Sequence, residues 1–381
     1  MSVQLLQTIG WIGFALSAAS VAYSLLATVA VILWRQRRVR PDQPDYRPPV
    51  TVLKPLCGDE PCLYDALRSF CVQRYPQYQI VFGVREGADR ARRVVERLQR
   101  EFKTLDMTLV VNDRVIGRNF KVSNLANMVS AVRYDHLVIA DSDVIVGPDY
   151  LANVVQPLAS RSVGLVTCIY RGRAMGHLAS RIGALFIDGW FMPAVLVSRL
   201  LGSQSFVSGA TMALRRDTLE TIGGFEKLAN HLADDYILGR LVRQRGLRTV
   251  IAPVTVETVV TESDLSSVVG HELRWMRTIR SLQPAGYVFS GITCGMAVPI
   301  FGVVMGAGTL PVLGLLTGSL LLRLVLHCAW AELPPIRAMR AAWLVPARDL
   351  LVFGVWSAGF FCRNVSWRQQ TLSVAADGSL H

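Results

Sequence analysis

The chain has 381 residues, 51% of them hydrophobic and 18% charged, with a formal net charge of +12 at pH 7. So high an apolar fraction excludes a chain made only of soluble domains. The arginines gather beside apolar runs, where anionic lipid attracts them, so we expect a membrane surface and no nucleic acid as partner. The seven cysteines lack paired C-x-x-C spacing, which indicates neither a zinc site nor a disulfide framework.

The first apolar run predicts a retained membrane anchor over residues 1–40. Residues 9–34 carry no charge and exceed the roughly 20 residues that a helix needs to cross a hydrocarbon core. The run is too long for the core of a signal peptide and has no basic residue ahead of it. "RQRRVR" at 35–40 marks its cytoplasmic end, so the next part of the chain is expected in the cytoplasm.

Residues 41–285 are expected to form one α/β domain, joined to the anchor by a stiff linker over 37–49. Short apolar runs alternate with helix-period segments, which predicts a mainly parallel sheet covered on both faces. Ligands of such sheets bind at the carboxyl ends of the strands. The expected strands are 50–56, 78–84, 107–112, 136–143 and 163–170, and the helices between them are 58–73, 88–102, 121–133 and 148–159.

The expected strands end in polar residues. Lys54 ends the first, Glu86 and Asp89 follow the second, and the fourth runs into "DSD" with Asp141 and Asp143. The two aspartates share one face of an extended backbone, an arrangement that can hold Mg²⁺ or Mn²⁺ together with phosphate oxygens. The alternative is a surface turn, because Asp and Ser are common turn formers.

"GRNFKVSNLANM" at 117–128 places Gly117, Arg118 and Lys121 at a helix start. Free N–H groups and the helix dipole attract anions there, so the segment is typical of phosphate binding. An ordinary solvated helix start is the alternative.

"NHLADDYILGRLVRQRG" at 230–246 puts Asp234 and Asp235 where an apolar helix begins. One aspartate can cap the helix, and a second in the first turn complements its dipole. Because one residue satisfies the cap, the other is free to accept a proton from an attacking hydroxyl, as a general base does.

"GHELRWMRTIRSLQPAGY" at 270–287 carries three arginines at three-residue spacing, with His271 and Trp275 among them. Arg274 and its neighbours share one helix face, which is typical of an interfacial helix facing lipid headgroups. Such a helix also suits a site where a charged donor meets a lipid, because Arg recognises phosphate well.

Residues 286–381 are expected to form a second membrane region and a short tail. The block from Tyr287 to Trp330 predicts two spans, and the run over 350–362 predicts one more. Four spans would put the Arg-containing tail outside, against the charge rule. One segment is therefore interfacial or re-entrant.

Six motifs in order resemble a known family. "VTVLKPLCGDEP", "GRNFKVSNL", "IADSD", "GATMALRRD", "HLADDY" and "HELRW" are similar to those of inverting glycosyltransferases of the ceramide glucosyltransferase type. The bacterial hopanoid-biosynthesis glycosyltransferases resemble the chain most. The resemblance covers roughly residues 48–285 and implies a GT-A-type nucleotide-sugar-binding domain between transmembrane helices.

The resemblance implies roles for individual residues. Asp89 contacts the nucleotide, Asp141 and Asp143 hold the metal and diphosphate, and Asp235 is the base. Arg274 and Trp275 end a Q/R-x-x-R-W motif in which His271 replaces the usual first residue. The expected nucleotide-sugar-binding residues are Lys54, Glu86, Asp89, Lys121, Asp141, Arg274 and Trp275, and those on the acceptor side are Gly209, Thr211, Asp234 and His271.

The function expected from these patterns is transfer of a sugar from a UDP-sugar to a lipid hydroxyl, assisted by Mg²⁺ or Mn²⁺. The leading prediction is transfer of N-acetylglucosamine to a hopanoid, and the alternative is transfer of glucose to ceramide. Segments 181–197 and 206–217 are expected to line the acceptor side. We expect an integral protein of a bacterial inner membrane with its catalytic domain in the cytoplasm. A processive polysaccharide synthase and a non-catalytic nucleotide-binding membrane protein are the alternatives.

Overall fold

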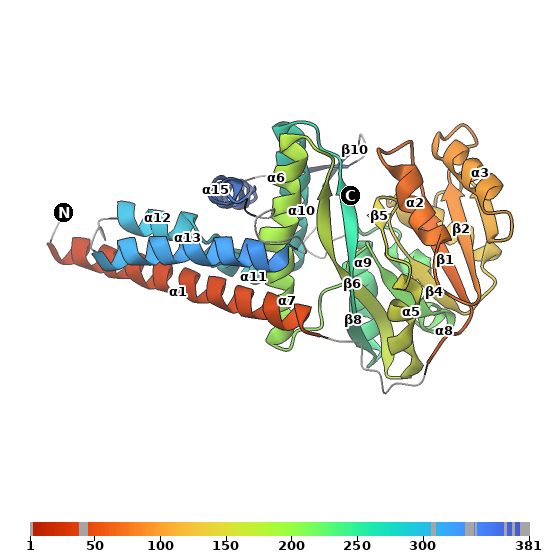
Figure 1. Cartoon of the computed structure of the whole chain (residues 1–381), viewed down its shortest axis with the longest axis horizontal. Helices are drawn as coiled ribbons and strands as arrows, with labels where there is room; N and C mark the ends of the chain where they lie inside the picture. The colour runs from red at the N-terminus through yellow and green to blue at the C-terminus, as the bar shows by residue number, and fades with distance from the viewer. Residues whose placement is uncertain are drawn as a thin grey trace.

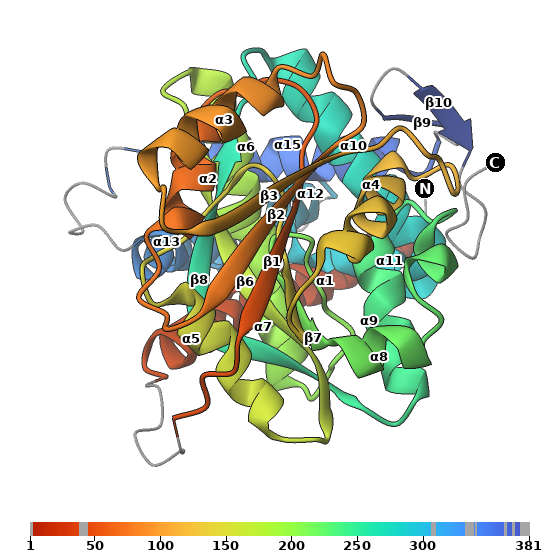
Figure 2. The ribbon, with the colours of Figure 1, turned by 90° about the vertical axis from the view of Figure 1, so that its right-hand side faces the viewer.

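A computed structural model describes residues 3–37, 45–305, 310–331, 339, 341–361, 364–367 and 370–373. Its main feature is an eight-stranded sheet in the order β3-β2-β1-β4-β7-β6-β8-β5 (Figures 1 and 2). The strands are β1 (Val50–Pro55), β2 (Tyr78–Val84), β3 (Asp106–Val111), β4 (His136–Ile139), β5 (Val144–Ile145), β6 (Val163–Ala174), β7 (Met212–Arg215) and β8 (Arg248–Val260). A separate antiparallel pair is formed by β9 (Asn364–Trp367) and β10 (Gln370–Ser373).

The sheet is mixed. The first four strands in spatial order are parallel, and so are β6 and β8. However, β7 runs antiparallel to β4 and β6, and β5 runs antiparallel to β8. The expectation of a mainly parallel sheet therefore holds for the N-terminal half and is wrong around β7, where a strand returns in the opposite direction beside β4.

Helices cover both faces of the sheet. One face packs against α2 (Leu63–Cys71), α3 (Ala91–Glu101) and α5 (Tyr150–Val155). The other packs against α4 (Phe120–Met128), α8 (Arg216–Thr221) and α9 (Asp234–Gln244). All six residues of β1 are buried, as in strands covered on both sides.

Several element boundaries differ from expectation. The strand expected over 136–143 ends at Ile139, so Asp141 and Asp143 lie in the loop and turn that follow it and not on an extended strand. The helix expected from 58 begins only at Leu63, because Cys62 before it has a φ of 62°, a left-handed conformation that a helix cannot include. The strand expected over 163–170 continues to Ala174, since its far end pairs with β8 beyond the core.

The membrane helices extend away from the sheet. In Figure 1, α1 (Val3–Arg35), α12 (Ala297–Val304) and α13 (Leu310–Trp330) run side by side. A Cβ on Gly13 of α1 would lie 3.2 Å from the Cα of Gly302 in α12. Small residues allow this close approach, as they do between membrane helices generally. At the other end, Arg35 donates to the carbonyl oxygen of Ala329 at 2.7 Å and joins α1 to α13.

A second set of helices runs crosswise between these spans and the sheet. It consists of α6 (Leu178–Phe186), the π-helical turn η3 (Ile187–Phe191), α7 (Met192–Leu200), α10 (Leu265–Leu282) and α15 (Leu344–Ala358). Figure 1 shows α6, α7 and α10 across the end of α1, with α15 viewed along its axis. Helices crosswise to α1 cannot also run along the membrane normal, so we interpret them as an interfacial layer.

The expected spans need one correction. By length and composition alone, three described helices could cross a membrane: Gln7–Arg35, Leu178–Leu200 and Leu310–Trp330, with a fourth if the bent pair Pro284–Thr293 and Ala297–Val304 counts as one. Leu178–Leu200 is the crosswise segment of α6, η3 and α7, which no expected span covered and which we interpret as interfacial from its direction. The pair bends by 75°, as a broken span or a re-entrant loop does, and the interfacial or re-entrant segment expected from the charge rule stays a prediction. By contrast, α15 has 15 residues, fewer than the roughly 20 that a span needs.

The last expected span, over 350–362, is not among the described helices that are long and apolar enough to cross a membrane, and it stays a prediction. Figure 1 shows α13 running back toward the sheet. Residue 362 lies outside the described residues, as do 38–44 of the expected basic flank and linker.

A buried ion pair joins α13 to α15. The Arg323 Nε donates to Asp349 Oδ2 at 2.7 Å, and a second contact joins Nη2 to the other carboxylate oxygen. Both side chains are almost wholly buried, at 4% and 2% exposed. Arg323 also donates to the carbonyl oxygen of Gly189 at 2.7 Å, so the same guanidinium holds the π-helical turn.

We expect Asp349→Ala to destabilise the protein by about 3–5 kcal/mol, because it leaves a buried guanidinium without its partner. Replacing both residues, Arg323→Met with Asp349→Leu, should recover most of the loss. Thermal unfolding of the full chain in detergent measures both effects. Unfolding of Asp349→Ala at the wild-type temperature would contradict this account.

Candidate functional site

The parallel register of β1 and β4 brings Lys54 beside Asp141. Leu53 pairs with Ile139, the last residue of β4, so Lys54, which is still paired with Phe82 of β2, lies beside the segment that follows β4. The Lys54 ammonium donates to the carbonyl oxygen of Asp141 and lies 4.1 Å from the centre of the Phe70 ring. Lys54 is fully buried. Burial lowers its pKa to about 8, against the opposing effect of Asp143 and Asp141.

Asp143 lies among other carboxylates. Burial first, and then the charges of Asp141 and Glu60, raise the pKa of Asp143 to about 7. Glu60 accepts a hydrogen bond from the Ser142 hydroxyl at 2.6 Å, which fixes the loop before α2 against the "DSD" segment. This end of the sheet therefore concentrates negative charge that a cation would stabilise.

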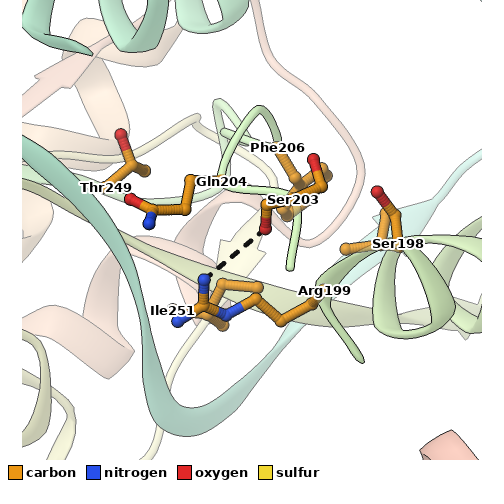
Figure 3. Close-up of a pocket in the computed structure, with 8 residues that line it drawn as sticks. Ser198, Arg199, Ser203, Gln204, Phe206, Thr249 and Ile251 are labelled. Carbon is orange, nitrogen blue, oxygen red and sulfur yellow. Dashed lines mark hydrogen bonds between the residues drawn. The ribbon is translucent and has the colours of Figure 1, made fainter. Parts of the chain in front are cut away.

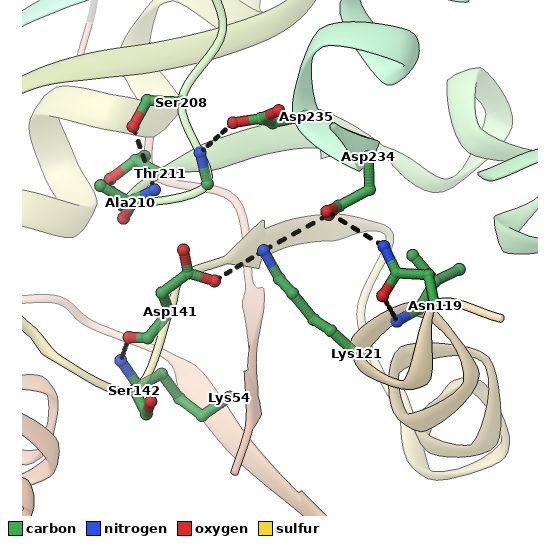
Figure 4. Close-up of polar contacts among 12 residues, drawn as sticks. Lys54, Asn119, Lys121, Asp141, Ser142, Ser208, Ala210, Thr211, Asp234 and Asp235 are labelled. Atoms are coloured by element: carbon green, nitrogen blue, oxygen red, sulfur yellow. Dashed lines mark hydrogen bonds and ion pairs between the residues drawn. The ribbon is translucent and has the colours of Figure 1, made fainter. Parts of the chain in front are cut away.

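Lys121 bridges two of the aspartates. Its ammonium lies 2.6 Å from Asp141 Oδ1 and 3.3 Å from Asp234 Oδ2, as Figure 4 shows. Burial by itself lowers the pKa of Lys121, but the nearby carboxylates, Asp141 foremost, raise it well above its usual value. The side chain is thus a fixed positive charge between the end of β4 and the start of α9.

The starts of α4 and α9 are joined by Asn119. Its side-chain carbonyl oxygen caps α4 by accepting from the Val122 N–H at 3.1 Å. Its amide donates to the His231 carbonyl oxygen at 2.9 Å and to Asp234 Oδ1 at 3.4 Å. Asp234 therefore serves the contact with α4, and α9 has no side-chain cap. This arrangement aims Lys121, in the first turn of α4, at the carboxylates.

Asp235 is attached to the loop before β7. Its Oδ2 accepts from the Gly209 N–H at 2.9 Å and its Oδ1 from the Tyr236 N–H at 2.7 Å. Burial first, and then the charge of Asp234, raise the pKa of Asp235 to about 6, while Lys121 opposes the shift. At neutral pH the group is mostly ionised and only weakly stabilised as an anion, which suits a proton acceptor.

The residues present fit a hard divalent cation. Carboxylate oxygens of Asp141 and Asp143 are the donors that Mg²⁺ and Mn²⁺ prefer. Among the described residues no three His, Cys, Asp or Glu side chains converge as a complete ligand set. Such an ion would therefore complete its shell with water and substrate phosphate, as magnesium sites commonly do.

Asp89 joins two segments of the chain through hydrogen bonds. Its carboxylate accepts from the Gly58 N–H at 3.0 Å and from the Ala91 N–H at 2.9 Å. It thus connects the loop after β1 to the start of α3. Glu86 is exposed at the same strand end. Their expected contacts with a nucleotide stay predictions.

An aromatic cluster connects the carboxylates to α10. We use this name for Tyr170, Phe186, Trp190, Phe191, Phe206 and Trp275. The Trp275 ring lies 5.0 Å from Phe191, which in turn lies 6.2 Å from Phe206 on the loop leading to Gly209. Phe191 also lies 6.4 Å from Tyr170 on β6. The site thus borders the interfacial helices.

His271 lies at the far side of this cluster. Its ring packs edge-on against Trp275 at 5.3 Å and its Nδ1 contacts the Glu262 carboxylate. Burial raises the pKa of Glu262. The neighbouring His271, and to a smaller extent Arg274, lower it, and the net pKa is below its usual value. The roles expected of His271, Arg274 and Trp275 stay predictions.

Thr211 is fully buried, and its hydroxyl lies 2.9 Å from the hydroxyl of Tyr150. It therefore packs in the core beneath the loop, while Gly209 faces the carboxylates. Sequence reasoning missed Glu60 and Tyr170. Burial first, and then Asp235, raise the pKa of Tyr170. Tyr170 could have been found, because it ends the expected strand 163–170.

The chain matches the family model of Glycosyl transferase family 21 over residues 13–380. It belongs to this family of glycosyltransferases. This confirms the expected enzyme class and the resemblance to ceramide glucosyltransferases at family level.

The family 21 chain is similar to ceramide glucosyltransferase 1 of Caenorhabditis elegans, with 27% identity over 249 residues, 63% of this chain and 53% of the relative. It is similar to ceramide glucosyltransferase of Komagataella phaffii, with 34% identity over 113 residues, 29% and 22% of the two chains. The alignment with the first relative thus spans about half of that protein's length.

A solved structure supports the fold. Mannosyltransferase PcManGT from Pyrobaculum calidifontis, in complex with GDP-Man and Mn²⁺, superimposes with a TM-score of 0.54 at 20% identity, covering 93% of this chain and 99% of that chain. The expected GT-A-type fold is therefore confirmed.

Gly209 allows the loop to approach the ion pair of this family 21 enzyme. An added Cβ would lie 2.6 Å from Asp141 Oδ2 and 3.1 Å from the Lys121 ammonium. We expect Gly209→Ala to displace these groups and lower turnover about tenfold to a hundredfold without unfolding the chain.

The rate of glycosyl transfer, with the donor and acceptor that the wild-type protein uses, measures the loss of turnover. Thermal unfolding shows whether the variant stays folded. Gly147→Ala is the control, because a Cβ there meets nothing within 4 Å. Equal turnover of the two variants would show that the close approach is unimportant.

Proposed function

We propose that this glycosyltransferase transfers a sugar from a UDP-sugar to a hydroxyl of a membrane lipid. The observation that carries the proposal is the position of Asp235. From the first turn of α9 it accepts a hydrogen bond from Gly209, whose loop also borders the ion pair of Lys121 with Asp141, and Phe206 of the aromatic cluster leads into that loop. A charged donor can thus approach from the sheet and an apolar acceptor from the interfacial helices.

Asp235 is the proposed base. Both oxygens of its carboxylate already accept backbone N–H groups, which fixes its orientation. Its remaining lone pairs can accept the proton of an acceptor hydroxyl as that oxygen attacks the anomeric carbon. One displacement with one base inverts the anomeric centre.

The proposed donor site stabilises the departing diphosphate. Asp141 and Asp143 would hold a divalent ion, which supplies Lewis-acid stabilisation of phosphate oxygens when bound. Lys121 and Arg274 contribute fixed positive charge, and Lys54 supports the "DSD" segment from beneath. We propose that Glu86, Asp89 and Trp275 complete the donor side, and that Asp234, His271 and the segments 181–197 and 206–217 border the acceptor.

We propose residues 41–285 as the catalytic domain on the cytoplasmic face of a bacterial inner membrane, with 1–40 and 286–381 as membrane regions. The motif resemblance favours a hopanoid acceptor with N-acetylglucosamine. The similarity to ceramide glucosyltransferases of other organisms favours ceramide with glucose. Both acceptors present a hydroxyl on an apolar body, so one site chemistry serves either.

The assay of this function incubates the purified full chain in detergent with Mn²⁺ or Mg²⁺. UDP-N-acetylglucosamine or UDP-glucose is supplied with a polyhydroxylated hopanoid or ceramide, and the lipid product is detected by mass. We expect one donor and acceptor pair to give a glycolipid, and a chelator to stop its formation. Donor left intact with every lipid would contradict the proposal and favour a protein that only binds nucleotide.

We expect Asp235→Asn to reduce turnover by about a hundredfold or more, because an amide cannot accept the proton. Donor binding, measured by calorimetry with the UDP-sugar, should remain near wild type. Asp234→Asn is the matched control: it leaves the proposed base intact but weakens the contact with Lys121. Near-normal turnover of the Asp235→Asn variant would exclude Asp235 as the base.

A further inference from the structure

A small pocket with a mostly apolar lining surface lies apart from the carboxylate site. It is lined by Val195, Ser198, Arg199, Ser203, Gln204, Phe206, Thr249 and Ile251, and Figure 3 shows the polar side chains around it. None of the aspartates or lysines described above lines it. Its walls are the end of α7, the loop 203–206 and the first residues of β8.

One buried hydroxyl in this pocket lacks a partner. Thr249 is 3% exposed, and its Oγ1 makes no hydrogen bond within the described part of the chain. A buried hydroxyl without a partner costs free energy, so native proteins usually satisfy it with protein, water or ligand. Thr249 is one of the residues that line the pocket.

The pocket is surrounded by positive charge. Arg199 lines it, and Arg37 and Arg248 lie close enough to repel the Arg199 charge. Arg243 donates to the Gln204 carbonyl oxygen at 2.9 Å and so adds a fourth guanidinium at the loop.

In the described residues no carboxylate forms an ion pair with any of these four arginines. Uncompensated arginines beside a pocket with free donors recognise anions, and phosphate best of all.

The pocket lies where the anchor meets the interfacial helices. Arg37 lies just beyond the end of α1, and Figure 1 shows this end of α1 next to α7. Directly after α7, Leu201 is 74% exposed, and Leu200 is 44% exposed. Exposed leucines beside clustered arginines are typical of a surface that meets both the acyl boundary and the headgroups of a membrane.

We propose that the pocket of Arg199, Ser203, Gln204 and Thr249 binds the phosphate of an anionic phospholipid headgroup. The Arg199 guanidinium supplies the charge-assisted contact and the Thr249 hydroxyl donates the buried one. Arg37 and Arg248 attract the headgroup from the leaflet. A bound lipid would hold the loop 203–206 and fix the catalytic domain against the membrane.

The test measures lipid retention by native mass spectrometry of the full chain in detergent, with phosphatidylglycerol or phosphatidylcholine of the same acyl chains. We expect wild type to retain phosphatidylglycerol preferentially. Arg199→Gln should weaken that retention about tenfold, as loss of one charge-assisted hydrogen bond does. Thr249→Val keeps the shape of the side chain and should also weaken retention, without lowering the unfolding temperature.

Arg100→Gln is the control, because it removes the same charge from an exposed position on α3, remote from α1 in Figure 1. Retention that is unchanged in both Arg199→Gln and Thr249→Val would overturn the proposal. Equal retention of the two lipids, with inorganic phosphate alone raising the unfolding temperature of wild type but not of Arg199→Gln, would overturn the lipid as ligand.

Discussion

Four aspartates and two lysines meet at one end of the sheet, and the ion pairs of Lys121 hold this arrangement together. Burial raises the pKa of Asp143 and Asp235, so the fold opposes their ionisation. The Lys121 ammonium, which lies between Asp141 and Asp234, offsets part of that cost for Asp235, and the Lys54 ammonium does so for Asp143. The proposed binding of a diphosphate beside an ionised base would need such internal compensation.

The ion pair also constrains the backbone around it. Lys121 reaches the carboxylates only because Asn119 joins the starts of α4 and α9. Gly209 must lack a side chain, because its Cα borders Asp141. The loop that carries Gly209 also carries Phe206, so the aromatic cluster transmits the position of the interfacial helices to the site. Chemistry and membrane geometry are therefore coupled through one short loop.

The sequence predicted the strand ends well and the contacts between them poorly. Lys54 and Asp141 were each placed at the end of a buried strand, because a continuous apolar run followed by a charge is a local pattern. Their direct contact depends on the β1 and β4 register, which no local pattern contains. Asp89 and Thr211 show the same limit. Gly58, which donates to Asp89, and Tyr150, whose hydroxyl contacts that of Thr211, are both far away in the sequence. The span expected over 350–362 stays a prediction, because hydropathy reports apolar content and not the direction in which a helix runs.

The sequence by itself determined the membrane anchor, the α/β alternation and the acidic motifs, because hydrophobic period and residue chemistry are local properties. Only the tertiary structure decided that β7 runs antiparallel beside β4, that Lys121 lies between two aspartates, and that α6, α7, α10 and α15 run crosswise to the spans. Each of these depends on packing between segments far apart in the chain. Such packing depends on which apolar surfaces are buried together and which charges are paired when the whole chain folds.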